Sequence, residues 1–218
     1  MKRRNRLASY YPIFLNISGR RCVVVGGGQV ALRKVRTLIE CGADIEVISP
    51  DLCLELRRLA ESREVRALNR EYQSGDLRGA FVVIAVTDNS DVNRKVAEEA
   101  KRNAALVNVV DDAENSDFII PSYLRRGDVT VAISTAGKSP ALARKIRTRL
   151  EKDLGNEYAS LTNLIGEVRA EAKRQRIQVD GDDWQEALDL DLLLELLHSG
   201  ESERARALLL TNLKKQQK

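Results

Sequence analysis

The stretch Cys22-Val23-Val24-Val25-Gly26-Gly27-Gly28-Gln29-Val30-Ala31 decides the fold of this chain. Its apolar run is typical of a buried parallel strand, and three glycines end that strand abruptly. Within it, Gly26-x-Gly28-x-x-Ala31 matches the dinucleotide-binding fingerprint with alanine in the third place. Gly26 would permit the tight turn, and Gly28 would let the backbone approach a pyrophosphate at the following helix N-terminus. The stretch predicts a nucleotide site, although an ordinary strand-turn-helix unit would also explain the glycines.

A second strand and an acidic residue follow. Apolar residues at helical spacing predict a helix over 31–41, and residues 45–48 predict the next strand. The fingerprint expects an acid about 20 positions on, where it holds the ribose hydroxyls. Asp51 stands near that place, directly after Pro50; its alternative role is to cap a helix over 52–60. No arginine stands directly at the strand end, which favours NAD over NADP.

Strand and helix signals alternate from about residue 10 to residue 112, as in a doubly wound parallel sheet. Further strands are predicted at 65–68, 81–86 and 106–110. Ligands of such sheets lie at the carboxyl ends of the strands, so several strand ends should line one crevice. The cofactor-binding candidates that this topology supplies are Gly26, Gly28, Thr87, Asp88 and Asn108.

The pattern changes after residue 112. Residues 118–121 and 129–134 predict two strands around a turn, and helices are predicted over 140–154, 158–175, 184–197 and 201–213. The fold class is therefore α/β, with an N-terminal Rossmann-type parallel sheet, a small central β/α region and an all-helical C-terminal domain. The expected domains are residues 1–112, 113–154 and 155–218.

Two further segments contain candidate catalytic or substrate-binding residues. Asp111 and Asp112 end the strand at 106–110, where a carboxylate can act as a general base; alternatively, both residues only begin the next turn. The loop Ser134-Thr135-Ala136-Gly137-Lys138-Ser139 ends like a P-loop, but Ala132 stands where that motif requires glycine, which excludes a P-loop hydrolase. The loop still suits an anion, with a basic helix from Arg144 onward, although an ordinary capped helix start explains it as well.

Net charge, aromatic content and cysteine content narrow the classes of protein and partner. The net charge of +4 suits a polyanionic small substrate, and with only 4% aromatic residues we expect no nucleic-acid partner. No apolar run approaches the ~20 residues of a membrane span, and no apolar core follows the basic stretch at residues 1–6. Three cysteines without a CxxC pair and a single histidine, His198, indicate reduced thiols and no metal site. We therefore expect a cytoplasmic protein.

Ordered motifs over roughly residues 10–155 carry a family resemblance. They are YP-I-F at 11–14, VVVGGGQVALRK at 23–34, Thr87-Asp88, NVVDD at 108–112, Phe118-Ile119-Ile120-Pro121 and ISTAGKSPALARKIR at 133–147. Together they resemble the siroheme-synthase dehydrogenase family, whose members are precorrin-2 dehydrogenases, some of which also have sirohydrochlorin ferrochelatase activity.

The resemblance implies an NAD-binding Rossmann domain, a central dimerisation region and a helical C-terminal domain. It implies a tetrapyrrole substrate with eight carboxylates, which would explain the basic loop. The family's catalytic aspartate falls on Asp111. Its nucleotide contacts fall on Gln29, Val30, Pro50 and Asp51, and the residues expected to bind substrate are Ser134, Thr135, Lys138, Ser139 and Arg144.

We therefore predict a homodimer that oxidises precorrin-2 to sirohydrochlorin with NAD as its cofactor, and we leave open whether it also inserts iron. The alternative is a non-catalytic, NAD-sensing regulatory module. Such a module would need the glycine loop but neither Asp111 nor the Lys138 loop.

Overall fold

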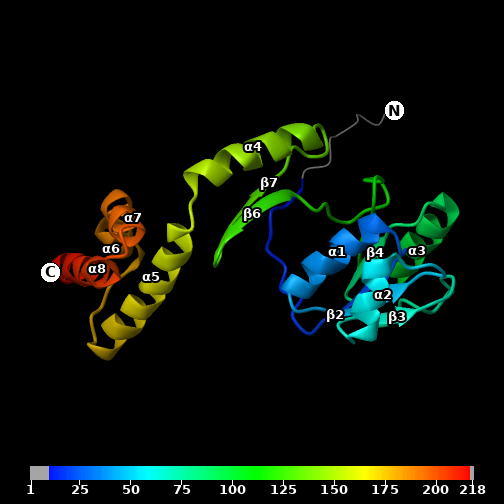
Figure 1. Ribbon diagram of the computed structural model, residues 1–218, viewed down its shortest axis with the longest axis horizontal. Helices are drawn as coiled ribbons and strands as arrows, with labels where there is room; N and C mark the ends of the chain where they lie inside the picture. The colour runs from blue at the N-terminus through cyan, green and yellow to red at the C-terminus, as the bar shows by residue number, and fades with distance from the viewer. Residues whose placement is uncertain (1–9, 217–218) are drawn as a thin grey trace, which may run out of the picture. The chain divides into compact units, whose positions relative to one another are not determined.

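A computed structural model describes residues 10–216 (Figure 1), so the basic stretch at residues 1–6 lies outside the described part. The chain divides into two compact units, residues 1–120 and 121–218, which are described separately. The three-part division at residues 112 and 154 stays a prediction. Within residues 10–216, no helix is long and apolar enough to cross a membrane.

Unit 1 is a parallel sheet whose strand order reverses next to the glycine loop. The order is β3-β2-β1-β4-β5, so the reversal falls between β1 and β4. In sheets of this kind, ligands bind outside the carboxyl ends of the strands at the reversal. The predicted doubly wound sheet is confirmed, with strands β1 (Arg21–Val25), β2 (Asp44–Ile48), β3 (Arg66–Leu68), β4 (Val82–Ala85) and β5 (Leu106–Val109).

Helices cover both faces of this sheet because its strands are apolar on both sides. Val24 and Val47 face α1 (Gln29–Glu40) and α2 (Leu54–Glu61) in one core cluster. Val23 and Val25 face α3 (Ser90–Arg102) in the other. β1 is the middle strand of the sheet and contributes side chains to both clusters. Full burial of one such side chain stabilises the fold by roughly 1.5–3 kcal/mol.

Unit 2 begins with a hairpin of β6 (Ser122–Arg126) and β7 (Val129–Ile133), followed by α4 (Pro140–Asp153). The prediction of a strand over 118–121 is wrong. Phe118 packs instead against the core of unit 1, and its carbonyl accepts a hydrogen bond from the Asn108 side chain at 2.9 Å. Phe118 is thus apolar because it packs on the core of unit 1, while Ile120 is exposed and neither residue pairs within the hairpin. Ser139 caps α4 with Pro140 in its first turn, as predicted.

The rest of unit 2 is a helical bundle with its own core around Leu164, Leu193 and Leu209. The single helix predicted over 184–197 is wrong, because Asp189 interrupts it: its side chain accepts a hydrogen bond from the Leu192 amide and starts a new helix. The helices are α5 (Glu157–Arg174), α6 (Gly181–Ala187), α7 (Leu190–His198) and α8 (Ser202–Gln216).

A buried carboxylate on α3 holds the long loop between β3 and β4. Glu99 is 4% exposed and accepts hydrogen bonds from the Tyr72 hydroxyl at 2.6 Å and from the Gly75 and Leu77 amides, each at 2.9 Å. Burial opposes ionisation of this group, but the hydrogen bonds outweigh burial and lower the pKa of Glu99 below its ordinary value. Burial and the neighbouring Glu99 raise the pKa of Tyr72.

We expect Glu99→Gln to lower the free energy of unfolding at pH 7 by about 1–3 kcal/mol, because its amide group cannot accept all three bonds. Folding lowers the pKa of Glu99 below its unfolded-state pKa of about 4.3. The ionised carboxylate therefore stabilises the fold fully at pH values above that unfolded-state pKa, and this contribution is lost as the pH falls through the lower pKa of the folded state. Urea unfolding of both proteins should therefore show a difference that shrinks below about pH 4.

The matched control is Glu98→Gln, one residue away on the same helix with an exposed side chain. It should change stability by less than about 0.5 kcal/mol. Equal losses in the two variants would show that Glu99 does not anchor the loop.

Candidate functional site

The glycine loop brings three strand ends into backbone contact. Gly26 has φ +129°, and a Cβ atom there would lie 2.5 Å from the Val86 carbonyl oxygen. A Cβ atom on Gly27 would collide with the Asp51 carbonyl oxygen, while the Gly27 carbonyl accepts a bond from the Cys53 amide at 2.8 Å. Gly26 and Gly27 are therefore required by packing within the protein.

Gly28 differs from its two neighbours because it faces open space. A Cβ atom added there meets no atom within 4 Å, and the backbone has an ordinary φ of −85°. Gly28 is the N-cap of α1, yet no side chain caps this helix and its first turn carries no acid. The first amide groups and the positive end of the helix dipole thus face the open side of Gly28. A dinucleotide pyrophosphate fits this cradle.

The loop after β2 lies beside the cradle. The buried Ser49 hydroxyl donates to the Asp51 carbonyl at 2.7 Å, which fixes the turn and leaves the Pro50 and Asp51 side chains exposed. The alternative role of Asp51 as a helix cap is wrong, since α2 has Cys53 as its N-cap. Gln29 and Val30 form the first turn of α1. The resemblance implies nucleotide contacts at these four residues, and those contacts stay predictions.

The other cofactor candidates are arranged differently. The Thr87 hydroxyl donates to the Asn93 side chain at 2.8 Å, and the Asp88 side chain is exposed. Asn108 is 8% exposed and uses its amide group to hold Phe118. The polar groups of Thr87 and Asn108 are therefore engaged in contacts within the protein, and binding of the cofactor by these residues stays a prediction.

The structure gives the two aspartates after β5 different roles. Asp112 accepts hydrogen bonds from the Asn115 backbone amide at 3.1 Å and from its side chain at 2.6 Å, which lower the pKa of Asp112. Asp111 is exposed and has a left-handed backbone with φ +62°. Asp112 thus shapes the turn, and Asp111 presents a carboxylate at the carboxyl end of the sheet.

Left-handed backbone marks both candidate loops. Five non-glycine residues in the described chain have positive φ, and three of them, Arg63, Ala104 and Arg176, follow helix C-termini, where this conformation is common. The other two are Asp111 and Ala136. Strained backbone away from helix ends is concentrated at functional sites.

In unit 2, hydroxyl groups hold the second candidate loop. The Ser134, Thr135 and Ser139 hydroxyls accept hydrogen bonds from the backbone amides of Ala136, Ser139 and Leu142, at 3.0–3.1 Å. Lys138 and Arg144 are exposed. The capped helix start is therefore confirmed, and the binding of an anion by this loop stays a prediction.

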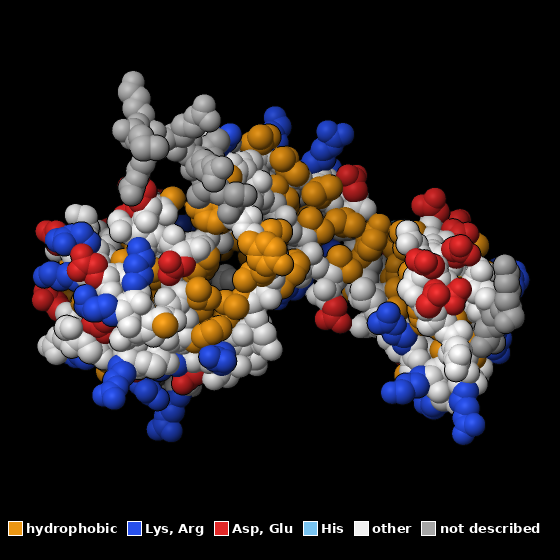
Figure 2. Space-filling view, turned by 180° about the vertical axis from the view of Figure 1, so that it is seen from behind, with side chains coloured by type: hydrophobic (Ala, Val, Ile, Leu, Met, Phe, Trp, Pro, Cys, Tyr) orange, Lys and Arg blue, Asp and Glu red, His pale blue; other side chains and the backbone are white. Residues whose placement is uncertain are grey.

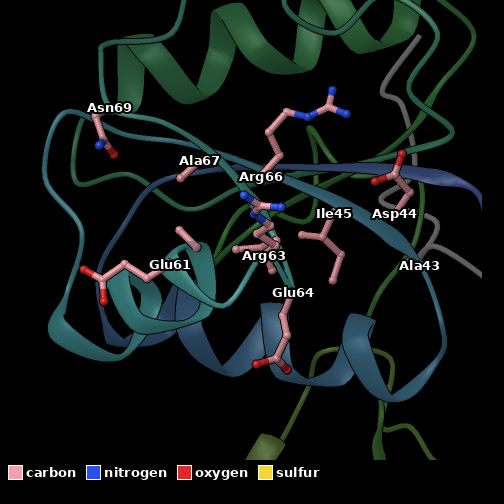
Figure 3. A pocket seen from close by; sticks show the side chains of 11 residues that line it. Ala43, Asp44, Ile45, Glu61, Arg63, Glu64, Arg66, Ala67 and Asn69 are labelled. Atoms are coloured by element: carbon pink, nitrogen blue, oxygen red, sulfur yellow. The ribbon is translucent and has the colours of Figure 1, made fainter.

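An open cavity of about 580 Å³ lies away from these residues (Figure 3). It adjoins the amino end of β2, the edge strand β3 and the end of α2, with Arg63 and Arg66 among its lining residues alongside Glu61 and Glu64. Charges of both signs, at the end of the strands opposite to the glycine loop, do not suit a polyanion or a dinucleotide. Residues 10–216 contain no group of three histidine, cysteine, aspartate or glutamate residues that could hold a metal ion.

The sequence pattern gave no reason to single out Lys34 on α1. It is partly buried, and the charge of Asp111 acts on it. The available signal was its position three residues after the buried Ala31, which places a cation near the inward face of the helix.

Comparisons with known proteins identify the family of this sequence. The NAD(P)-binding family profile matches residues 13–122, and the profile of the central part of sirohaem biosynthesis proteins matches residues 126–153. The siroheme synthase of Chromobacterium violaceum is 40% identical over 200 residues, which cover 91% of this chain and 42% of that protein. The siroheme synthase of Photobacterium profundum is 43% identical over 161 residues, covering 74% and 34%. The chain thus spans less than half the length of these relatives.

A solved structure matches over its whole length. "SirC, precorrin-2 dehydrogenase" superposes with a TM-score of 0.70 and 26% identity, covering 94% of this chain and 100% of that one. The family resemblance and fold class predicted from the motifs are confirmed.

The cradle at Gly28 yields a sharp prediction. Gly28→Asp should fold at least as well as the wild type, because aspartate is a favourable N-cap for α1. It should weaken NAD binding more than tenfold, roughly 1.4 kcal/mol or more, by placing bulk and negative charge where the pyrophosphate lies. Isothermal titration with NAD and thermal unfolding measure the two effects.

Gly28→Asn introduces a side chain of the same size as aspartate but without its charge. Comparing NAD binding in the two variants separates the effect of side-chain size from that of charge repulsion. Gly26→Ala is the opposite control and should lose stability first, because its Cβ atom has no room. Wild-type NAD affinity in Gly28→Asp would place the cofactor elsewhere.

Proposed function

The chain belongs to the NAD(P)-binding family, and its residues 126–153 match the central part of sirohaem biosynthesis proteins; on that premise we propose that it oxidises precorrin-2 to sirohydrochlorin with NAD. The observation that carries this proposal is the likeness to SirC, precorrin-2 dehydrogenase, over the full length of that structure. The siroheme synthases support it less directly, because more than half of each lies outside the match. Exposed Asp51 beside the cradle favours NAD over NADP, since a carboxylate suits ribose hydroxyls and repels a 2′-phosphate.

The reaction requires two hydrogens to leave the macrocycle. When bound, NAD⁺ supplies the acceptor for one of them, which leaves with both electrons. The amide groups at the start of α1 would hold the pyrophosphate, and the strand ends at the β1–β4 reversal would orient the nicotinamide half. The Asp111 carboxylate accepts the second hydrogen as a proton, a role open to it because Asn115 pairs with Asp112 instead.

The substrate's carboxylates explain the second loop. Lys138 and Arg144 are exposed cations at the start of α4, held on a loop whose hydroxyls are already engaged with backbone amides. Ser134, Thr135 and Ser139 would shape this loop, and Lys138 would form a charge-assisted bond with a carboxylate. A purely regulatory, NAD-sensing module would need neither this loop nor Asp111.

A homodimer and a cytoplasmic location complete the proposal. Large apolar side chains are exposed in both units, including Tyr11 and Phe14 in unit 1 and Leu142 in unit 2, and Figure 2 shows hydrophobic side chains reaching the surface. Such surfaces favour association; sedimentation as a monomer would count against the dimer. The three cysteines are free thiols, as is usual in the cytoplasm.

Asp111→Asn tests the catalytic role. Asparagine tolerates the left-handed backbone and keeps the shape of the side chain, so the variant should fold and bind NAD. Loss of a general base should lower kcat by about 10²–10⁴-fold, measured as NADH formation from precorrin-2. Iron insertion into sirohydrochlorin, assayed on the same variant, tests whether one carboxylate serves both reactions.

Asp112→Asn is the matched control, and it should affect thermal stability more than turnover because its carboxylate supports the turn. Turnover by Asp111→Asn within a few-fold of the wild type would assign proton removal to another group.

Lys138→Ala tests the substrate loop. Loss of one charge-assisted contact, roughly 1.5–3 kcal/mol when desolvated, should raise the KM for precorrin-2 about tenfold or more and leave NAD binding intact. Lys145→Ala, on α4 and also exposed, is the control. An unchanged KM in Lys138→Ala would restrict the loop to starting α4.

A further inference from the structure

Lys34 is a cationic residue of unit 1 that has no role in the proposed mechanism. It lies within α1, six residues after Gly28 and so about 9 Å along the helix axis from the start of the helix. Its neighbours Ala31 and Val35 are fully buried in the core of unit 1, and Lys34 itself is partly buried. Its side chain therefore leaves the helix beside the inward face, while Arg33 is exposed.

No ion pair compensates this burial. Among the described residues, Lys34 has no carboxylate oxygen within 4.0 Å. Burial, with a smaller contribution from Arg33, lowers the pKa of Lys34, and the charge of Asp111 acts in the opposite direction. A partly desolvated ammonium group without a pair is unfavourable, and an anion that bound to it would relieve that cost.

The turn that carries Asp111 packs on the same core cluster as α1. Val110 and Phe118, on either side of Asp111, contact the core cluster that contains Ala31 and Val35 of α1. The charge of Asp111 raises the pKa of Lys34, against the effect of burial. The segments that carry this carboxylate and this ammonium group pack on one core cluster, and the two groups form no ion pair with each other.

We propose that Lys34 binds one carboxylate of the substrate beside Asp111, an inference that rests on the polyanionic substrate proposed above. A base with a negative charge repels a polyanion, and a neighbouring cation offsets that repulsion without neutralising the base. The carboxylates of a tetrapyrrole lie on its periphery, so one can reach Lys34 while the ring meets Asp111. Unit 1 would then hold the substrate through its own contact, independently of Lys138 in unit 2.

The test uses uroporphyrin III, an octacarboxylate porphyrin, titrated into the full chain without NAD and followed by fluorescence. Lys34→Met keeps the length of the side chain and removes its charge, and it should raise the Kd about tenfold. Lys34→Arg should stay within about threefold of the wild type because it keeps the charge. Arg33→Met, the exposed neighbour, is the matched control and should leave the Kd unchanged.

Asp111→Asn should shift the Kd the other way, toward tighter binding, because it removes the repulsive charge. A Kd that rises in Lys34→Met and falls in Asp111→Asn would indicate a carboxylate bound between α1 and the turn that carries Asp111. Lys34→Gln serves as a second neutral variant if Lys34→Met is unstable.

Three results overturn the inference: a wild-type chain that does not bind uroporphyrin, equal losses in Lys34→Met and Arg33→Met, or a loss of NAD affinity alone in Lys34→Met. The last result would assign Lys34 to the cofactor phosphates. The proposed reaction fails on a different measurement, the absence of NADH when the wild type meets precorrin-2, so the two failures can be told apart.

Discussion

The structure of unit 1 depends on backbone contacts at Gly26 and Gly27 that leave no room for a Cβ atom. The Gly26 amide donates to the Ile48 carbonyl at 2.9 Å, and Gly27 lies against Asp51 and Ser49. These contacts bring the ends of β1, β2 and β4 together at the reversal of strand order. In a sheet of this topology a ligand is expected there, outside the carboxyl ends of the strands at the reversal.

The same tight turn determines the electrostatics of the site. Asn89 caps α3 and Ser139 caps α4 with side-chain hydrogen bonds, but α1 begins at Gly28, which has no side chain to offer. The amide groups that a cap would satisfy stay available to an anion. Gly26 and Gly27 are thus required by packing, whereas nothing in the fold occupies the space beside Gly28.

The sequence predicted what depends on local pattern. The apolar runs predicted β1 and β4, and the glycines predicted the tight turn into α1, so the parallel sheet and the open start of α1 could be predicted. Phe118 could not, because an apolar residue does not reveal which core buries it. Lys34 was also hidden, since a lysine at a helical position is ordinarily solvated.

The choice between Asp111 and Asp112 shows why neighbouring identical residues need a structure to separate them. Asn115 engages the Asp112 carboxylate, and that interaction closes the turn with Asp111 in the left-handed region. Aspartate adopts this conformation more readily than most residues, at a cost of order 1 kcal/mol. Glycine would avoid that cost, but it would remove the carboxylate. A strained aspartate beside a satisfied one is therefore better explained by chemistry at Asp111 than by stability of the turn.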